Sequence, residues 1–241
     1  MRALQIIIQA RMTSTRLPAK IMMPIAGKPV LQWMIERLGR YKKDIIIATT
    51  NDGSEAPIVE LCQKLDVHFF KGSTEDVLSR YYYAAIDNGA TEQTAVMRLT
   101  SDCPLIDPGL VNQCIEHFNS GRYDMVSLGP HSGYPRGLDT CIFNFDLLEK
   151  THLTATTQPE REHVTLGMGK VKKLASHVLH AEHDLTRFRL TLDEADDFTA
   201  ISRVFELMNY QTDFDYSTLQ STLLAHPEVA EINSHVEQKQ V

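Results

Sequence analysis

The sequence predicts an α/β fold with a mostly parallel β-sheet and helices on both of its faces. Short runs rich in β-branched residues alternate with segments of helical periodicity through the first half of the chain, which is the pattern of successive strand–helix–strand units. Crossovers between parallel strands are almost always right-handed, so such units build up one sheet. Capping residues stand where several helical segments begin, which supports the same assignment.

The first half of the chain is expected to contain strands and helices in strict alternation. The predicted strands cover residues 4–9, 44–49, 67–70, 94–99 and 124–128. The predicted helices lie between them, over residues 29–40, 55–65, 75–88 and 108–119. Ser54 and Thr74 precede two of these helices, and Asp107 with Pro108 gives a third helix an N-cap and a first-turn proline.

The pattern changes after residue 129. Glycine and proline predict a loop over residues 129–135, and the segments that follow are expected to include strands at 138–145, 171–180 and 188–192 and helices at 159–168 and 194–208. We expect a single domain over residues 1–241, with residues 130–186 inserted as a lid. The polar tail, residues 226–241, is expected to fray.

Composition excludes several classes of protein. A net charge of −7 argues against non-specific nucleic-acid binding, and no stretch approaches the roughly 20 apolar residues that span a bilayer. The four cysteines form no C-x-x-C pair, so reduced thiols are expected. These features predict a soluble, cytoplasmic protein with no nucleic-acid or membrane partner.

A cluster of cations follows the first predicted strand. The segment "IIIQARMTSTRLPAK" contains Arg11, Arg16 and Lys20 and no acidic residue. Ligands of parallel α/β sheets bind at the carboxyl ends of strands, and Arg and Lys are the usual partners of phosphate. The loop is therefore a candidate phosphate site; the alternative is a solvated basic loop that pairs with surface acids.

Two acidic residues follow other predicted strands. Asp102 ends the strand in "RLTSDCPLIDP", and Asp193 follows the apolar segment in "FRLTLDEADDF". Magnesium in phosphate-binding sites prefers one or two carboxylates together with phosphate oxygens and water. The pair therefore predicts a magnesium site beside the basic loop, although capping of the next helix is an alternative role for Asp193.

Further charged residues lie in the predicted insertion. "YPRGLDTCIF" offers Arg136 and Asp139 around Gly137, and "PEREHVT" offers Glu160, Arg161 and His163 near the start of a helix. Arg136 and Arg161 are candidates to clamp an acidic acceptor. A salt-bridged surface is the alternative.

Together these motifs resemble those of the sugar-acid cytidylyltransferases. The segment "IIIQARMTSTRLPAKIMMPIAGKPVLQWMIERL" is most similar to the amino-terminal signature of the spore-coat polysaccharide biosynthesis branch. The similarity covers nearly the whole chain, because it continues through "GSTEDVLSRYYYAA", "RLTSDCPLIDP", "PRGLDTCIF", "EREHVT", "RLTLDEADDF" and "INSHVEQK". Many relatives have glycine where this chain has Thr13 and Ala19; if Ala19 requires a positive φ, it costs about 1 kcal/mol against glycine.

The resemblance implies a nucleotide-diphospho-sugar transferase (GT-A-like) fold of Rossmann type, CTP as donor, Mg²⁺ as cofactor and a possible homodimer. The triphosphate would be held by Arg11, Arg16 and Lys20. The cytosine and ribose would lie against Gln9, Ala10 and residues 72–77, including Ser73 and Asp76. The metal would be held by Asp102 and Asp193. The sugar-acid acceptor would contact Arg136, Asp139, Glu160, Arg161 and His163.

The expected reaction is attack of an acceptor hydroxyl on the α-phosphate of CTP, with release of pyrophosphate. The residues expected to act directly are Arg11, Lys20 and Asp102. Two other functions remain open from the sequence: a glycosyltransferase that uses a finished nucleotide sugar, and a non-catalytic nucleotide-binding homologue.

Overall fold

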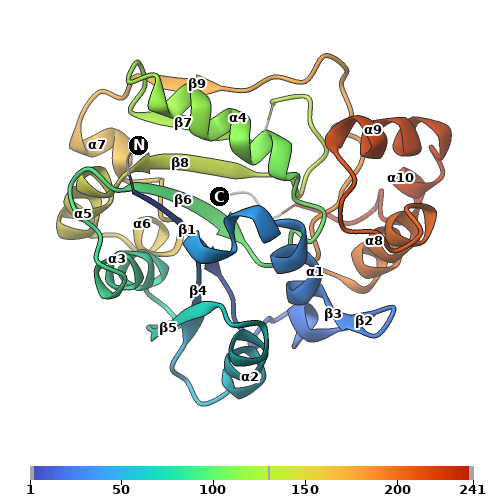
Figure 1. Cartoon of the computed structure of the whole chain (residues 1–241), viewed down its shortest axis with the longest axis horizontal. Helices are drawn as coiled ribbons and strands as arrows, with labels where there is room; N and C mark the ends of the chain where they lie inside the picture. Colours follow the sequence, from blue (N-terminus) through green and yellow to red (C-terminus); the bar gives the residue numbers. More distant parts are fainter. Residues whose placement is uncertain (1–2, 130, 239–241) are drawn as a thin grey trace.

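The computed structural model describes residues 3–129 and 131–238. In this part of the chain seven strands form one sheet, in the order β5-β4-β1-β6-β8-β7-β9 (Figure 1). Their bounds are Leu4–Gln9 (β1), Ile45–Thr50 (β4), His68–Gly72 (β5), Ala95–Thr100 (β6), Met125–Leu128 (β7), Thr140–Asn144 (β8) and Ser176–Val178 (β9). A separate two-stranded ribbon joins Pro24–Ile25 (β2) to Lys28–Pro29 (β3).

The sheet is mostly parallel, as predicted. Strands β5, β4, β1 and β6 run in one direction, and Ile6 of β1 lies opposite Ile45 on one side and Met97 on the other. Strand β8 is antiparallel to both β6 and β7, and β9 is parallel to β7. The carboxyl ends of β1 and β6 therefore lie side by side at one edge of the sheet, where ligands of such folds bind.

Helices cover both faces of the sheet. Ile6 and Ile8 of β1 pack in one apolar cluster, and Ile7 packs in the other, because successive side chains of a strand point to opposite faces. The first cluster is covered by Val30–Arg37 (α1), Ala56–Leu65 (α2), Pro108–Asn119 (α4) and Ala195–Leu207 (α8). The second is covered by Val77–Asp87 (α3), Phe145–Thr154 (α5) and Met168–Val171 (α7).

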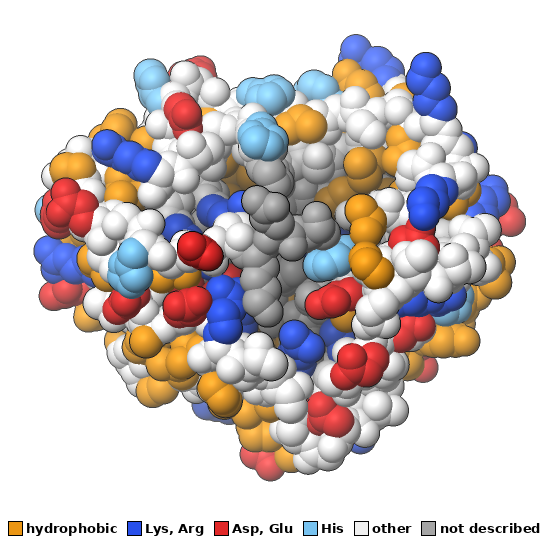
Figure 2. All heavy atoms as spheres, turned by 180° about the vertical axis from the view of Figure 1, so that it is seen from behind, with side chains coloured by type: hydrophobic (Ala, Val, Ile, Leu, Met, Phe, Trp, Pro, Cys, Tyr) orange, Lys and Arg blue, Asp and Glu red, His pale blue; other side chains and the backbone are white. Residues whose placement is uncertain are grey.

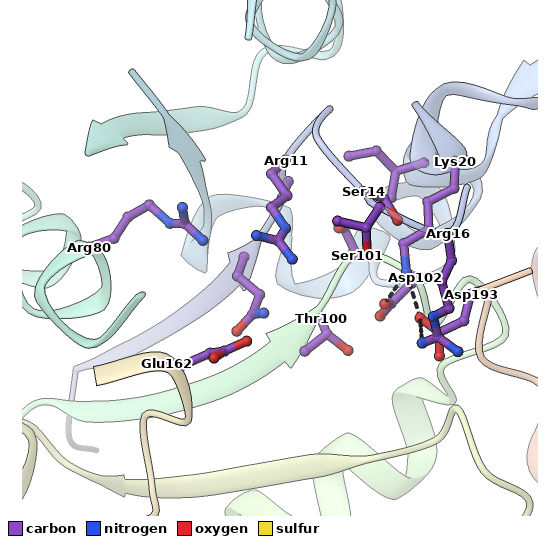
Figure 3. Close-up of a pocket in the computed structure, with 14 residues that line it drawn as sticks. Arg11, Ser14, Arg16, Lys20, Arg80, Thr100, Ser101, Asp102, Glu162 and Asp193 are labelled. Carbon is purple, nitrogen blue, oxygen red and sulfur yellow. Dashed lines mark hydrogen bonds and ion pairs between the residues drawn. The ribbon is translucent and has the colours of Figure 1, made fainter. Parts of the chain in front are cut away.

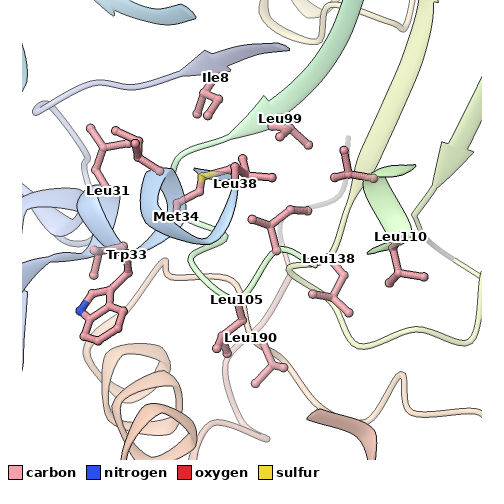
Figure 4. Close-up of a cluster of buried hydrophobic side chains, with 14 of the residues drawn as sticks. Ile8, Leu31, Trp33, Met34, Leu38, Leu99, Leu105, Leu110, Leu138 and Leu190 are labelled. Carbon is pink, nitrogen blue, oxygen red and sulfur yellow. The ribbon is translucent and has the colours of Figure 1, made fainter. Parts of the chain in front are cut away.

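Figure 4 shows buried side chains of the first cluster, which come from distant parts of the chain. Ile8 and Leu99 of the sheet lie beside Met34 of α1, and Leu138 and Leu190 come from the second half of the chain. All of these side chains are essentially inaccessible to water. Full burial of such a side chain is worth about 1.5–3 kcal/mol, so this core fixes the segment around Leu190 against the first half.

The remaining elements are short or lie at the C-terminal end of the chain. Helix α8 packs with Tyr216–Ala225 (α9) and Val229–Ile232 (α10) (Figure 1). The others are the helix Gln158–Glu162 (α6) and the 3₁₀ turns Lys20–Met22 (η1) and Gly39–Asp44 (η2). No helix within the described residues is both long and apolar enough to cross a membrane.

Several predicted elements need correction. Residues 188–192 form no strand beyond an isolated bridge between Arg136 and Arg189, because they pass the ends of the strands as a connecting segment. Residues 145–154 form helix α5 where the sequence analysis had only the end of a strand. Helix α6 ends at Glu162 and α7 begins at Met168, so residues 163–167 of the predicted helix at 159–168 are not helical.

Other boundaries also differ. Of residues 171–180 only the three residues of β9 are strand. Asp76, rather than Thr74, caps α3, because its carboxylate accepts a hydrogen bond from the Ser79 N–H at 2.8 Å.

The tail and the inserted segment are more tightly joined to the domain than predicted. The tail holds α10 and the buried Asn233, so residues 226–238 do not fray as a whole; residues 239–241 lie outside the described part, as does residue 130. Strands β8 and β9 of the inserted segment belong to the main sheet. A lid role for residues 130–186 stays a prediction.

Candidate functional site

A polar crevice of about 180 Å³ opens at the carboxyl ends of β1 and β6 (Figure 3). Its walls come from the first loop, from the ends of these strands, and from residues far along the chain. The lining residues are Gln9, Ala10, Arg11, Ser14, Thr15, Arg16, Lys20, Ile21, Arg80, Thr100, Ser101, Asp102, Glu162 and Asp193. The structure thus brings together Gln9, Ala10, Arg11, Arg16, Lys20, Asp102 and Asp193, as the sequence analysis predicted.

Lys20 lies between the two predicted metal ligands. Its ammonium donates to Asp102 Oδ2 at 2.8 Å, to Asp193 Oδ1 at 2.9 Å and to the Leu192 carbonyl at 2.5 Å. Burial lowers the pKa of Lys20, but the attraction of Asp102 and Asp193 outweighs it, so the pKa lies above its ordinary value. Lys20 is therefore firmly cationic in this site.

The local chain path explains how Lys20 reaches these carboxylates. Ala19, at the start of η1, has φ of 56° and ψ of 19°, which is the left-handed conformation that favours glycine. The condition stated for Ala19 in the sequence analysis is thus met. The Ala19 N–H donates to the Met12 carbonyl at 2.9 Å, which closes the loop and turns Lys20 inward.

Asp193 carries more ion pairs than Asp102. Arg16 lies 3.0 Å from Asp193 Oδ1, and Arg189 lies 2.6 Å from Asp193 Oδ2. Burial raises the pKa of Asp193, yet Lys20, Arg16 and Arg189 together lower it below its ordinary value. The carboxylate is thus ionised at neutral pH, which a metal ligand or a cation anchor requires.

Helix capping does not explain Asp193. Helix α8 is capped by Glu194, whose side chain forms a reciprocal capping box with Asp197. Asp107 does cap its helix, since its carboxylate accepts from the Leu110 N–H at 2.7 Å. The alternative role considered for Asp193 is therefore wrong, and its carboxylate is free to face the crevice.

The donor set fits a magnesium ion. One ammonium contacts both Asp102 and Asp193, so the two carboxylates lie within reach of a single cation. Both offer the hard oxygen ligands that Mg²⁺ prefers. Among the described residues no group of three or more His, Cys, Asp or Glu side chains is placed to hold a metal, so a metal here would take its other ligands from phosphate and water.

The crevice continues into a second hollow that the sequence analysis did not foresee in full. Gln9, Arg11, Arg80 and Glu162 line both spaces, and Arg98 of β6 lines the second one. Arg80 Nε, Arg98 Nε and Gln9 Oε1 are buried without a hydrogen-bond partner in the described part of the chain. Buried polar atoms normally have partners, so these atoms are placed to meet a bound polar molecule.

Arg80 and Arg98 were missed although the sequence holds a signal for each. Arg80 lies on the apolar face of α3 and is 1% exposed, and Arg98 lies on an otherwise apolar central strand. A charged residue at a buried position requires a partner or a function. The presence of a charged residue among the apolar residues of a predicted strand or helix face was the signal for both.

Ser73 and Asp76 do not line the second hollow but hold the loop that does. The Ser73 hydroxyl accepts from the Asp76 N–H at 3.0 Å, and the Arg80 guanidinium donates to the Ser73 carbonyl at 2.9 Å. Neither residue lines the hollow itself, but Thr74 and Glu75 between them do. Their contacts therefore fix the loop that faces the space.

Arg136 and Asp139 line a separate hollow of about 300 Å³, which shares no lining residue with the crevice. Asp139 Oδ2 accepts from the Gly137 N–H at 2.9 Å. No hydrogen bond or ion pair of the Arg136 guanidinium occurs within residues 3–129 and 131–238, so this cation is available to a ligand. Gly137 has φ of 101°, and a Cβ there would lie 2.4 Å from the Leu190 backbone, so only glycine allows this close approach.

The other three predicted acceptor residues are not grouped together. Glu160 is buried and completes the cap of α6, where it accepts from the Thr156 and Thr157 N–H groups and pairs with Lys170. Arg161 donates to the Ala155 carbonyl and pairs with Asp76 at 3.4 Å. Only His163 lines a hollow, the one beside Arg80.

The cysteines offer no nucleophile to this site. Cys62, Cys103, Cys114 and Cys141 are all free thiols, as predicted. Burial raises the pKa of Cys62, Cys114 and Cys141 to about 12 and that of Cys103 well above its usual range. Thiols with such pKa values stay protonated at neutral pH.

Charge is distributed unevenly over the molecule. Figure 2 shows Lys and Arg side chains gathered near the middle of one face, with Asp and Glu side chains among them. The net charge of −7 therefore coexists with local positive charge. A local cationic site of this kind offers charge partners to an anion.

The chain is similar in sequence to known cytidylyltransferases. Residues 5–191 match the family model described as cytidylyltransferase. The chain is 30% identical to the spore coat polysaccharide biosynthesis protein SpsF of Bacillus subtilis, over 93% of this chain and 95% of that protein. It is also 30% identical to 3-deoxy-manno-octulosonate cytidylyltransferase of Photobacterium profundum, over 52% of this chain and 50% of that enzyme.

A solved structure resembles the whole chain. It is a cytidylyltransferase from Leptospira borgpetersenii, with a TM-score of 0.88, 28% identity and complete coverage of both chains. The family match spans the first loop, the strand-end carboxylate Asp102 and the segment around Arg136. The chain is a nucleotidyltransferase and belongs to the cytidylyltransferase family.

Proposed function

We propose that the protein is a Mg²⁺-dependent enzyme that joins CMP from CTP to a sugar acid of the nonulosonic-acid type and releases pyrophosphate, in surface polysaccharide biosynthesis. The observation that carries this proposal is the contact of the Lys20 ammonium with Asp102, just after β6, and with Asp193, in the segment before α8. The crevice around this contact is lined by the carboxylates of Asp102, Asp193 and Glu162 and by the cations of Arg11, Arg16, Lys20 and Arg80. Carboxylates and cations together are the composition that a metal–triphosphate complex requires.

The triphosphate is proposed to bind along the first loop. Arg11 has no ion pair in the described part of the chain and lines both hollows, so it can meet phosphate oxygens directly. Arg16 and Lys20 now contact carboxylates and can turn to the phosphates when these arrive. Their charges stabilise the departing pyrophosphate, and fixed charges of this kind supply much of the catalysis in such reactions.

Asp102 and Asp193 are the proposed holders of Mg²⁺. When bound there, the metal supplies Lewis-acid stabilisation of the phosphate charge. The chain itself contributes the rigid placement of both carboxylates, since the Leu192 N–H donates to the Asp102 carbonyl at 2.8 Å and ties the two segments together.

The base and ribose are proposed to occupy the hollow between Gln9 and the loop 72–77. Gln9 Oε1 and Arg80 Nε are buried without a hydrogen-bond partner within residues 3–129 and 131–238, and both residues line this hollow. Ala10 contributes backbone at the end of β1, and Ser73 and Asp76 hold the opposite loop in place. Arg98 adds a further donor at the floor of the hollow.

The acceptor is proposed to bind beside Arg136. This guanidinium can hold the carboxylate of a sugar acid in a bidentate pair, and Asp139 can accept from its hydroxyls. We further propose that residues 130–186 form the acceptor side of the site, with His163 at its border. Arg161 would act there only indirectly, by holding α6 against the start of α3, and Glu160 by capping α6 and pairing with Lys170. One relative is named for a sugar acid, 3-deoxy-manno-octulosonate, and another for spore coat polysaccharide biosynthesis, and both names support this choice of acceptor and role.

A pyrophosphate-release screen tests the proposal. CTP, UTP, GTP and ATP are each incubated with a panel of nonulosonic and octulosonic acids, with Mg²⁺ or with a chelator. Release that requires CTP, Mg²⁺ and one sugar acid supports the proposal. Release with another nucleotide contradicts CTP as the donor, and release with a neutral sugar phosphate contradicts a sugar acid as the acceptor. Release without a divalent metal contradicts the Mg²⁺ dependence.

A further inference from the structure

A second carboxylate lies directly beneath Asp193. Asp197, in the first turn of α8, is 0% exposed, and its carboxylate accepts hydrogen bonds on both oxygens. Asp197 Oδ2 accepts from the Asp193 and Glu194 N–H groups at 2.9 and 3.0 Å. These two bonds belong to the helix cap and fix the backbone that carries Asp193.

The other oxygen of Asp197 has a role outside the cap. Asp197 Oδ1 accepts from Arg189 Nε at 2.9 Å, and the same guanidinium donates through its NH2 group to Asp193 Oδ2 at 2.6 Å. Arg189 is thus held between two carboxylates, one buried and one facing the crevice. Its hold on Asp193 Oδ2 leaves Asp193 Oδ1 turned toward Lys20 and Arg16.

The C-terminal end of the chain completes this arrangement. Asn233, which is 1% exposed, follows α10, and its Nδ2 donates to Asp197 Oδ1 at 2.8 Å and to the Arg189 carbonyl at 2.9 Å. Gln238 Oε1 accepts from the Arg189 NH1 group. The tail therefore packs against the support of Asp193 rather than against an unrelated surface.

We propose that Asp197 and Asn233 are positioning residues for the reaction: they fix Arg189, and Arg189 orients the Asp193 carboxylate toward the metal and triphosphate. The C-terminal segment is by this means a part of the working site. This inference rests on the proposed function, because it concerns how Asp193 is aimed at the metal.

The energetics favour positioning over mere stabilisation. A buried ion pair such as Arg189–Asp197 is often no more stabilising than apolar residues of the same size, since both charges must lose water. A helix cap needs neither Arg189 nor Asn233. Residues that orient a metal ligand typically change metal affinity or activity 10- to 100-fold when replaced.

The test compares Asp197→Asn with Asp196→Asn. The two residues are neighbours in the first turn of α8, but Asp196 is exposed, and within the described residues its one ion pair is with His235. In Asp197→Asn the amide oxygen remains for the backbone donors, and its NH₂ group then faces Arg189 Nε and Asn233 Nδ2, so these two donors lose the acceptor that Asp197 Oδ1 gave them. The measured quantity is the affinity for Mn²⁺ in the presence of CTP and without acceptor, determined by electron paramagnetic resonance. Circular dichroism checks that each variant is folded.

We expect Asp197→Asn to bind Mn²⁺ 10- to 100-fold more weakly than the parent protein, and to lose kcat/KM for CTP in proportion, because metal and CTP binding are linked. Asp196→Asn should match the parent protein. Asn233→Ala, which keeps the Arg189–Asp197 pair, should bind Mn²⁺ about tenfold more weakly, against no change in Ser234→Ala. Ser234 is exposed and donates only to the Glu231 carbonyl.

Three results would overturn the inference. A folded Asp197→Asn protein with parental Mn²⁺ affinity refutes it while leaving the proposed function intact. If Asp197→Asn does not fold, Asn233→Ala decides, and equality with Ser234→Ala refutes the inference. A parent protein that binds no Mn²⁺ with CTP overturns both the proposed function and this inference.

Discussion

The Lys20 ammonium lies 2.9 Å from Asp193 Oδ1, although 173 residues separate the two in the chain. Lys20 belongs to the first loop and Asp193 to the segment that precedes α8. Their contact joins two walls of the crevice that come from distant parts of the sequence. Most of the proposed chemistry depends on this contact, because it brings the basic loop to the carboxylates of Asp102 and Asp193.

Replacing Lys20 by Met should lower kcat/KM for CTP by about 100- to 1,000-fold, the usual effect of losing one donor to a developing negative charge. Pyrophosphate release measures the effect. Lys28→Met is the matched control, because Lys28 also pairs with a carboxylate, Glu36, at 2.7 Å but lies outside the crevice. A Lys20→Met protein with turnover within threefold of the parent would refute the role of Lys20.

Replacing Ala19 by Gly should stabilise the protein by about 1 kcal/mol, because glycine adopts a positive φ without the steric cost that alanine meets there. Urea denaturation measures the change. Ala155→Gly is the control, since Ala155 has φ of −65° and glycine offers no advantage at that angle. Destabilisation by Ala19→Gly would mean that the left-handed turn before Lys20 is wrong.

Replacing Arg136 by Ala should raise KM for the acceptor about 10- to 100-fold, because a hydrogen-bonded charged group is worth about 1.5–3 kcal/mol. KM for CTP should change less than threefold, since Arg136 does not line the crevice at the strand ends. Arg187→Ala serves as the control, because Arg187 stacks on Phe188 and lines neither hollow. Equal changes in both KM values would contradict a separate acceptor hollow.

Glu160 should affect stability more than catalysis. Its pKa is lowered to about 2, first by Lys170 and then by the Thr157 and Thr156 N–H groups. A carboxylate with a lowered folded-state pKa contributes stability that is present above its unfolded pKa, about 4.5, and is lost as pH falls toward 2.

Glu160→Gln should therefore lower the thermal midpoint at pH 7, and the difference from the parent should shrink between pH 4.5 and pH 3. Glu92→Gln, at an exposed position, controls for loss of one charge. A difference that stays constant over this pH range would contradict the ion pair and the cap. A large change in KM for the acceptor at pH 7 would instead give Glu160 a direct role.

The regular part of the fold was readable from sequence because local signals agree there. β1 and α4 lie where the pattern placed them, since the strand carries three successive isoleucines and the helix has an N-cap, Asp107, and a first-turn proline. Residues 188–192 were misread as a strand. Their apolar side chains are buried by packing against the ends of other elements, and burial alone does not distinguish a strand from a connecting segment.

The site was readable where its residues follow strands. Arg11 and Asp102 could be placed because loops after parallel strands meet at one edge. Asp193 was placed by the same rule, although the segment before it, residues 188–192, is not a strand of the sheet. Arg189, Asp197 and Asn233 could not, because their roles depend on contacts between segments 8 and 36 residues apart that no local pattern records. The motif around Glu160 predicted a contact with the acceptor. In the structure its carboxylate instead accepts hydrogen bonds in the cap of α6.

The central claim is that Asp102 and Asp193 form, with the basic loop, one site for a metal-bound nucleoside triphosphate. Calorimetric titration of CTP in magnesium buffer into the parent protein, Asp102→Asn and the exposed control Asp66→Asn tests it most directly. We predict CTP binding by the parent and by Asp66→Asn, and binding at least tenfold weaker by a folded Asp102→Asn protein. Equal, magnesium-independent binding by all three proteins would contradict the claim.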